Sequence, residues 1–208
     1  AIALFQQLKT LNPHYQSLYL YLAEALQEEE QLEEAKAVIE EGIAENPFQV
    51  ELYQFASENA YRLHDIAGAE NWLLKALELG EKTDESRLTL SNLYLTEERF
   101  EEVITILNDL EETDHPYAEW NLAKAYNELE DFAVAKVHYE QAAQELSHEP
   151  EFLKEYALFL REEGELEKAK HLLYHYLEHE PGDVDMQSVL ADMEAGSYTH
   201  LRAHETRH

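Results

Sequence analysis

The chain repeats a pattern of apolar and small residues about every 34 positions. In one ladder an apolar residue precedes a small one, and the small residues are separated by 34, 34, 32, 34 and 34 positions: Ala23, Ser57, Ser91, Ala123, Ala157 and Ala191. In a second ladder a residue is followed four positions later by a large one, with the same period and a single step of 32: Ala1, Ala35, Ala69, Val103, Ala135 and Ala169. Repeats of this length are typical of stacked units, each of which buries its apolar face only against its neighbours.

Each repeat is predicted to be a pair of helices. In one repeat the first helix has an apolar stripe at helical spacing, and the second has an inner face of small and large residues: Leu122, Ala125, Tyr126 and Leu129, then Ala135, Tyr139 and Ala142. Small residues allow two helix backbones to approach closely, and the bulky neighbours fill the remaining space. All five prolines lie near the junctions between repeats, where a missing amide donor is tolerated.

These residues resemble the tetratricopeptide repeat, whose pattern is W-x2-L-G-x2-Y, then A-x3-F, then P. The matching residues are Trp120, Leu122, Ala123, Tyr126, Ala135 and Tyr139 in one unit, and Ala169 with Pro181 in the next. Trp120 lies one place late, Ala60 replaces a tyrosine, and the unit at 84–115 is two residues short, so an irregular junction is expected near 113–117. The resemblance implies an all-α, right-handed superhelical solenoid of antiparallel helix pairs.

The repeat register divides the chain into units. A solenoid is expected over 1–195, with a half unit at 1–15, full units at 16–49, 50–83, 84–115, 116–149 and 150–183, and a half unit at 184–195. Residues 197–208 resemble a translated sequencing adaptor, so 196–208 are interpreted as a non-native tail without function. The chain does not begin with Met, and the native N-terminus is expected to be missing.

Composition excludes several classes of function. With 15 basic and 45 acidic residues the formal net charge is −30, which argues against binding to nucleic acid or to an anionic membrane. The chain has no Cys, no Gly-rich phosphate loop and no apolar run of about 18 residues. No arrangement of Ser, His and acid suggests catalysis. A non-enzymatic protein without a cofactor is therefore expected. The general similarity to bacterial tetratricopeptide repeat proteins implies a cytoplasmic location.

The resemblance also implies a function, because tetratricopeptide repeats bind peptides or partner proteins in a groove lined by their first helices. The family's groove positions carry over to these candidate partner-binding residues: Tyr61, Arg62, Leu88, Asn92, Leu95, Trp120, Lys124, Asn127, Lys154 and Arg161. The four cations would hold a free carboxylate or an acidic segment, and Trp120 would hold an apolar side chain. The alternative is that the cations are ordinary groove residues paired with nearby glutamates.

Other interpretations stay open at this point. The chain is interpreted as an interaction scaffold, but a peptide-sensing domain of a larger regulator and an accessory domain of an enzyme fit the same pattern. His171, His175 and His179 share one helical face, as zinc ligands do, although a polar outer stripe explains them equally well. No metal site is predicted, and the sequence does not indicate an oligomeric state.

Overall fold

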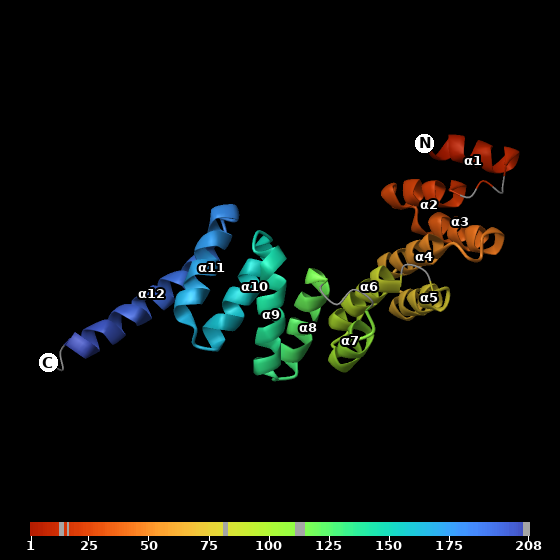
Figure 1. The fold of residues 1–208 in the computed structure, drawn as a ribbon. Helices are drawn as coiled ribbons and strands as arrows, with labels where there is room; N and C mark the ends of the chain where they lie inside the picture. The colour runs from red at the N-terminus through yellow and green to blue at the C-terminus, as the bar shows by residue number, and fades with distance from the viewer. Residues whose placement is uncertain (13–14, 16, 81–82, 111–114, 206–208) are drawn as a thin grey trace. The chain divides into compact units, whose positions relative to one another are not determined.

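A computed structural model of the chain describes residues 1–12, 15, 17–80, 83–110 and 115–205, with side chains described as far as Ala195. The described residues form twelve α-helices and no strand (Figure 1). The helices are α1 (Ile2–Leu11), α2 (Leu18–Glu28), α3 (Leu32–Glu45), α4 (Val50–Arg62), α5 (Ile66–Glu78), α6 (Thr83–Thr96), α7 (Phe100–Leu107), α8 (Pro116–Glu128), α9 (Phe132–Leu146), α10 (Pro150–Glu162), α11 (Leu166–His179) and α12 (Val184–Glu205). The predicted all-α repeat solenoid is confirmed.

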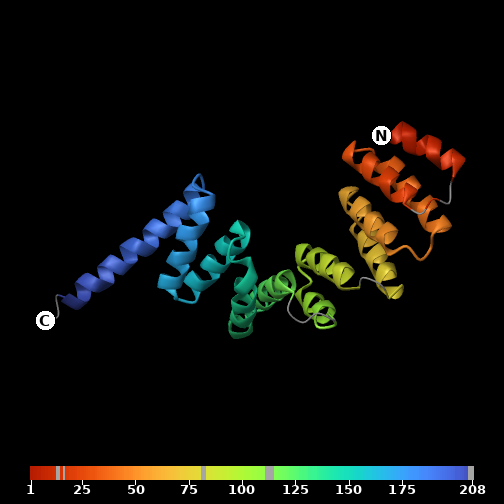
Figure 2. The same cartoon turned by 45° about the horizontal axis from the view of Figure 1, so that its top comes forward.

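The chain divides into two compact units, Ala1–Thr113 and Asp114–His208, and each is described by itself. In the first unit the helices pack in chain order, each against the next, and α2 also contacts α4 (Figure 2). The small residues of the repeat lie where helices cross: Ala23, Ala35 and Ala69 are all at most 1% exposed. Because their side chains are short, the neighbouring backbones can approach closely there.

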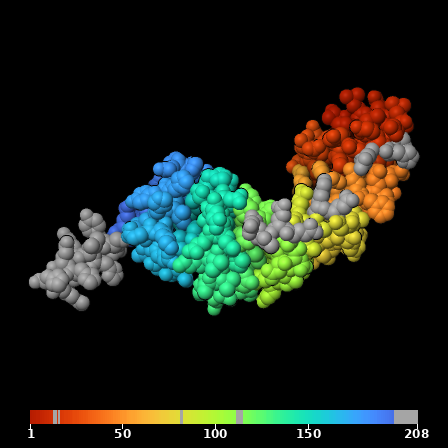
Figure 3. All heavy atoms as spheres, in the orientation of Figure 1, coloured from red at the N-terminus to blue at the C-terminus, as the bar shows by residue number. Residues whose placement is uncertain are grey.

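The second unit contains a cluster of packed aromatic side chains. Tyr139 stacks on Tyr156 with ring centroids 5.1 Å apart, and Phe159 lies 4.8 Å from the same ring. Ala135 and Ala142, the predicted inner-face residues of α9, are fully buried beside Tyr139. Figure 3 shows that the side chains of α9, α10 and α11 fill the space between these helices as one continuous body. Leu129, which was predicted to lie in the apolar stripe, is instead 37% exposed, because α8 has ended at Glu128.

A third ladder with the same period appears in the turns between paired helices. One residue per turn has a positive φ angle of 57–78°: Glu30, His64, Glu98, Glu130 and Gly164. The amide of the residue after each of them returns to a carbonyl of the preceding helix, as Glu165 N does to Leu160 O at 2.8 Å. This closure satisfies carbonyl groups at the helix end. Four of the five positions are not glycine, so these turns carry backbone strain.

Two boundaries predicted from the repeat differ in how they appear in the structure. Helix α12 continues to Glu205, past the end expected at residue 195, so the helical backbone extends into the segment interpreted as a non-native tail. The junction expected to be irregular near 113–117 coincides with the boundary between the two compact units. Residues 111–114 lie outside the described part of the chain, and α8 begins directly after His115 with Pro116 in its first turn.

Candidate peptide-binding surfaces

The first unit has a hollow between helices α4 and α6. Its volume is about 600 Å³, and α5 contributes part of its floor through Ala69 and Leu73. The lining residues are Glu51, Gln54, Phe55, Ser57, Glu58, Tyr61, Ala69, Leu73, Glu85, Thr89, Asn92, Leu93 and Thr96. A smaller hollow of about 290 Å³ lies between α2 and α4 and shares Phe55 and Glu58 with the first. The two hollows together are called the first-unit groove.

Acidic side chains surround the first-unit groove. The single cation among the lining residues is Arg62. Six glutamates line the two hollows: Glu24, Glu28, Glu30, Glu51, Glu58 and Glu85. Arg62 is engaged on both sides, because it donates to the carbonyl of Gln27 at 2.8 Å and to Glu30 Oε1 at 2.9 Å. The groove is therefore negative, and the positive charge predicted at Arg62 is neutralised by a neighbouring helix turn.

Buried amide side chains connect the first helices that form this groove. Gln27 on α2 donates to Asn59 Oδ1 at 3.3 Å, and Asn59 on α4 donates to the carbonyl of Leu32 at 3.0 Å. Gln54 on α4 donates to the hydroxyl of Ser86 on α6 at 3.3 Å. Gln27, Asn59 and Ser86 are at most 4% exposed. Because a buried polar group without a partner is costly, these bonds favour one relative placement of α2, α4 and α6.

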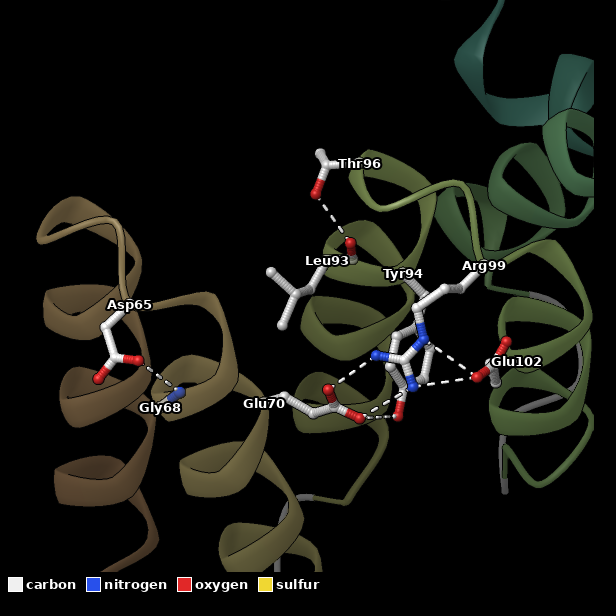
Figure 4. A network of polar contacts seen from close by, with 8 residues as sticks. All are labelled: Asp65, Gly68, Glu70, Leu93, Tyr94, Thr96, Arg99 and Glu102. Carbon is white, nitrogen blue, oxygen red and sulfur yellow. Dashed lines mark hydrogen bonds and ion pairs between the residues drawn. The ribbon is translucent and has the colours of Figure 1, made fainter.

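A second network of polar contacts holds α5 against α6 and α7 (Figure 4). Arg99 donates to both carboxylate oxygens of Glu70, at 2.7 and 3.0 Å, and lies 4.3 Å from the centre of the Tyr94 ring. The Arg99 hydrogen bonds lower the pKa of Glu70, whereas burial and the Glu70 charge raise the pKa of Tyr94 to about 12. Nearby, the hydroxyl of Thr96, which lines the groove, donates to the carbonyl of Leu93.

The second unit brings Trp120 and Lys124 together on α8. Lys124 Nζ lies 4.4 Å from the centre of the Trp120 ring, and the indole Nε1–H of Trp120 donates to Glu155 at 3.0 Å. Glu155 also accepts from the hydroxyl of Tyr139 at 2.8 Å. Burial lowers the pKa of Lys124, and the charge of Glu155 opposes this effect. In the part of the chain that is described, no carboxylate lies within 4.0 Å of the Lys124 ammonium group.

The other predicted cations of the second unit have carboxylate partners. Lys154 donates to Asp183 Oδ2 at 3.0 Å, and Asp183 also accepts from Tyr176 at 2.7 Å and from the amide of Met186. The Tyr176, Lys154 and Met186 hydrogen bonds lower the pKa of Asp183 to about 2. Arg161 lies 3.7 Å from Glu162. Three of the four predicted cations are thus paired with acids, as the alternative interpretation of the sequence expected.

The predicted site residues divide between the two units. Tyr61, Arg62 and Asn92 line the first-unit groove, while Leu88 and Leu95 are half-buried on α6 outside the lining. Trp120, Lys124, Asn127, Lys154 and Arg161 belong to the second unit, where all five are half-buried. Because Asn92 and Arg161 belong to different compact units, the continuous patch between them stays a prediction.

The prediction from groove positions missed one helix position that contributes in three of the repeats. Thr89 and Glu155 directly follow Leu88 and Lys154, which were assigned to the groove, and Phe55 lies one period before Thr89. Each of the three contributes to a hollow or to the Trp120 network. They are the sixth residues of their units and share the 34-residue period with one shorter step. The repeat register would therefore have identified them, had the sixth position been included.

The histidine stripe of α11 is partly assembled. The rings of His175 and His179 are 5.4 Å apart and meet edge to face, and His171 is exposed. Among the described residues no group of three His, Cys, Asp or Glu side chains is placed to hold a metal ion. The same part of the chain contains no helix with the length and apolar character needed to cross a membrane.

The fold defines a class of protein by its helix pairs, their period and the groove between the first helices. Comparison with known proteins agrees with that class. The chain belongs to the tetratricopeptide repeat proteins: the YpiA-like, C-terminal tetratricopeptide repeat family matches residues 116–183, and a tetratricopeptide repeat family matches residues 1–57. The TPR repeat-containing protein YpiA of Bacillus subtilis (strain 168) is 32% identical over 196 residues. That match covers 93% of this chain but only 46% of YpiA, so the chain spans about half the length of this relative.

Solved structures show the same fold. The similar structures include PilF of Pseudomonas aeruginosa, with a TM-score of 0.73, 17% identity and coverage of 90% of each chain. MamA of Desulfovibrio magneticus RS-1 has a TM-score of 0.69, 15% identity and coverage of 81% of this chain and 96% of its own. YrrB, described as a TPR protein with an unusual peptide-binding site, has a TM-score of 0.66 and 13% identity, and the match covers 91% of this chain and 98% of YrrB. Tetratricopeptide repeat proteins are generally protein-interaction scaffolds and typically not enzymes.

Proposed function

We propose that the chain is a scaffold that holds an extended segment of a partner protein in the first-unit groove. The observation that carries this proposal is the hollow of about 600 Å³ between α4 and α6, whose lining includes Tyr61 and Asn92 at family groove positions. Phe55, Leu73 and Leu93 offer an apolar surface there. An apolar side chain of the partner would bury against these three residues, while polar rim groups contact its backbone.

The buried amide bonds support this role, because they keep the groove formed in the absence of a ligand. Gln27, Asn59 and Gln54 join three successive first helices, so little ordering of the protein is needed when a peptide arrives. A preformed site loses less free energy to ordering on binding than a flexible one. The same groove would serve a scaffold or the sensory domain of a regulator.

A test can use peptides selected from a random library displayed on phage and captured by the purified chain. Thr89 is an exposed residue of α6 that lines the hollow, so the large side chain of Thr89→Trp would fill the hollow. Thr105→Trp is a matched control, because Thr105 is also exposed, lies outside the lining, and like Thr89 donates to the carbonyl four residues earlier. Selected peptides should lose at least about tenfold in affinity with Thr89→Trp and keep it with Thr105→Trp. Equal affinity for both variants would contradict the proposal.

A second binding surface is proposed at Trp120 and Lys124, for a free carboxylate or an acidic segment. The specific observation is that Lys124 is desolvated beside Trp120 and has no ion-pair partner among the described residues. A ligand carboxylate would supply the missing charge, and Asn127, Lys154 and Arg161 are the neighbouring predicted contacts. To bind the ligand, Lys154 would have to break its ion pair with Asp183, and Arg161 its ion pair with Glu162.

This second surface can be tested with two forms of one peptide, ending either in a free carboxylate or in an amide. Lys124→Met should remove any preference for the carboxylate form. Lys168→Met, which removes an exposed lysine already paired with Glu165, should leave that preference intact. If neither form of the peptide distinguishes Lys124→Met from the unaltered chain, the surface at Trp120 has another use.

A further inference from the structure

The charge around the first-unit groove indicates what kind of segment fits it. Resting on the proposed peptide-binding function, we infer that the ligand of this groove is basic: a segment with at least two Lys or Arg residues beside an apolar side chain. Six glutamates line the groove against one arginine, and that arginine is paired with Glu30. An apolar floor with an acidic rim complements a peptide in which cations flank an apolar residue.

The acids are arranged in two ladders that follow the repeat. Glu24 on α2 and Glu58 on α4 occupy equivalent positions one period apart, and so do Glu51 on α4 and Glu85 on α6. Neighbouring helices pack about 8–10 Å apart, and an extended chain advances about 3.3 Å per residue. The spacing of acids on successive first helices therefore equals the spacing of ligand cations about three residues apart. The apolar side chain between those cations would face Phe55.

Four of the six groove acids have no partner within the described part of the fold, in contrast to Glu30, which binds Arg62. Glu24, Glu28, Glu58 and Glu85 are exposed, and within the described residues none of their carboxylates has a hydrogen bond or a cation partner. They contrast with Glu70, whose carboxylate is fixed by Arg99 between two helices. Unpaired acids close together repel one another, so a basic ligand would relieve that repulsion.

Other occupants fit this charge poorly. A second copy of this chain carries a net charge of −30 and would be repelled from an acidic groove. An acidic peptide would meet the same repulsion, and Arg62 offers it little because Glu30 already accepts from that guanidinium. A positively charged segment of a partner protein is the occupant that the electrostatics favour.

The experiment compares three synthetic peptides by fluorescence anisotropy with the full chain. Each has acetylated and amidated ends and one leucine, flanked by two lysines three positions apart, or by two glutamines, or by two glutamates. The lysine peptide should bind at least about tenfold more tightly than the glutamine peptide at low salt, and the difference should shrink as salt screens the charges. The glutamate peptide should bind most weakly.

Two protein variants locate the effect. Glu24→Gln, Glu58→Gln and Glu85→Gln together remove three groove charges, whereas Glu34→Gln, Glu97→Gln and Glu101→Gln remove three exposed charges of the same unit outside the groove. The groove variant should lose at least about tenfold for the lysine peptide, and the control variant should lose less than about twofold. Melting curves should show both variants folded, since none of the six carboxylates has a partner in the described structure.

The outcomes separate the two proposals. If the lysine peptide loses equal affinity in both variants, it binds the general negative field and the inference is overturned. If the glutamate peptide binds most tightly and Thr89→Trp blocks it, the groove binds peptides but the inferred charge is wrong. If Thr89→Trp affects none of the three peptides or the phage-selected ones, peptide binding in this groove itself is contradicted.

Discussion

Arg99 and Glu70 form a two-point ion pair, with guanidinium nitrogens 2.7 and 3.0 Å from the two carboxylate oxygens of Glu70. Arg99 stands directly before α7, and Glu70 lies on α5 of the preceding repeat. The guanidinium also lies over Tyr94 and reaches Glu102, so one side chain connects three successive helices. A planar group with several donors is needed for this geometry, and lysine cannot reproduce it.

Replacing Arg99 with lysine should therefore lower the free energy of unfolding by about 1–2 kcal/mol, since a charge-assisted pair of hydrogen bonds becomes a single contact. Arg87→Lys is the control, because Arg87 makes one contact of 3.4 Å to the exposed Asp109 and should change stability by less than about 0.5 kcal/mol. Urea unfolding followed by circular dichroism measures both. Equal losses would show that the two-point geometry has no special importance.

Asp183 should make stability depend on pH at the acid end. Its folded pKa of about 2 lies below the ordinary value of 3.8, so its stabilising contribution is complete above that value and is lost as pH falls toward 2. Asp183→Asn should therefore be less stable than the unaltered chain at pH 7, and the gap should close between about pH 4 and pH 2. Urea unfolding at a series of pH values measures the gap. Asp185→Asn, which removes a carboxylate in the first turn of α12, is the charge-matched control.

Replacing Gly42 with alanine should lower the stability of the protein, although alanine has the higher helix propensity. An alanine usually stabilises an exposed helix interior by about 1 kcal/mol relative to glycine. Here a Cβ atom would lie 2.7 Å from Cβ and 2.9 Å from Cγ of Tyr19, which is fully buried. Gly42→Ala should instead cost about 1–3 kcal/mol by forcing α2 and α3 apart. Gly182→Ala is the control and should not lower stability, because a Cβ atom there would have no neighbour within 4 Å. If Gly42→Ala stabilised the protein, the close packing of Gly42 against Tyr19 would be contradicted.

The turn ladder predicts opposite effects at two equivalent positions. Glu130 has a φ of 61° and Gly164 has a φ of 78°, each in the turn between paired helices. Because a side chain in the left-handed region costs about 1–2 kcal/mol, Glu130→Gly should stabilise and Gly164→Ala should destabilise, each by about 1 kcal/mol. Thermal melting measures both. Changes of the same sign would show that the turns are not equivalent.

The architecture could be predicted because its causes are local or nearly so. The spacing of Ala135, Tyr139 and Ala142 defines a helix face within one element, and a face with that period must be covered by a neighbour of the same kind. All three residues are almost fully buried as expected. The turns between the paired helices, at 130–131 and at 163–165, keep the 34-residue period of the small residues.

The site was predicted less completely, because it depends on which side chains from different repeats meet. Tyr61 and Asn92 were assigned to the groove from the family pattern alone, and both line it. The sequence did not identify the acids that pair with the predicted cations, since Arg62 bonds to a residue 32 positions away and Lys154 to one 29 positions away. The sequence by itself determined the repeat, the helices and the buried small residues, because these follow from periodicity along one chain segment. Only the tertiary structure decided which charges are neutralised and which stay open to a ligand, because ion pairing is a choice among distant side chains that packing brings together.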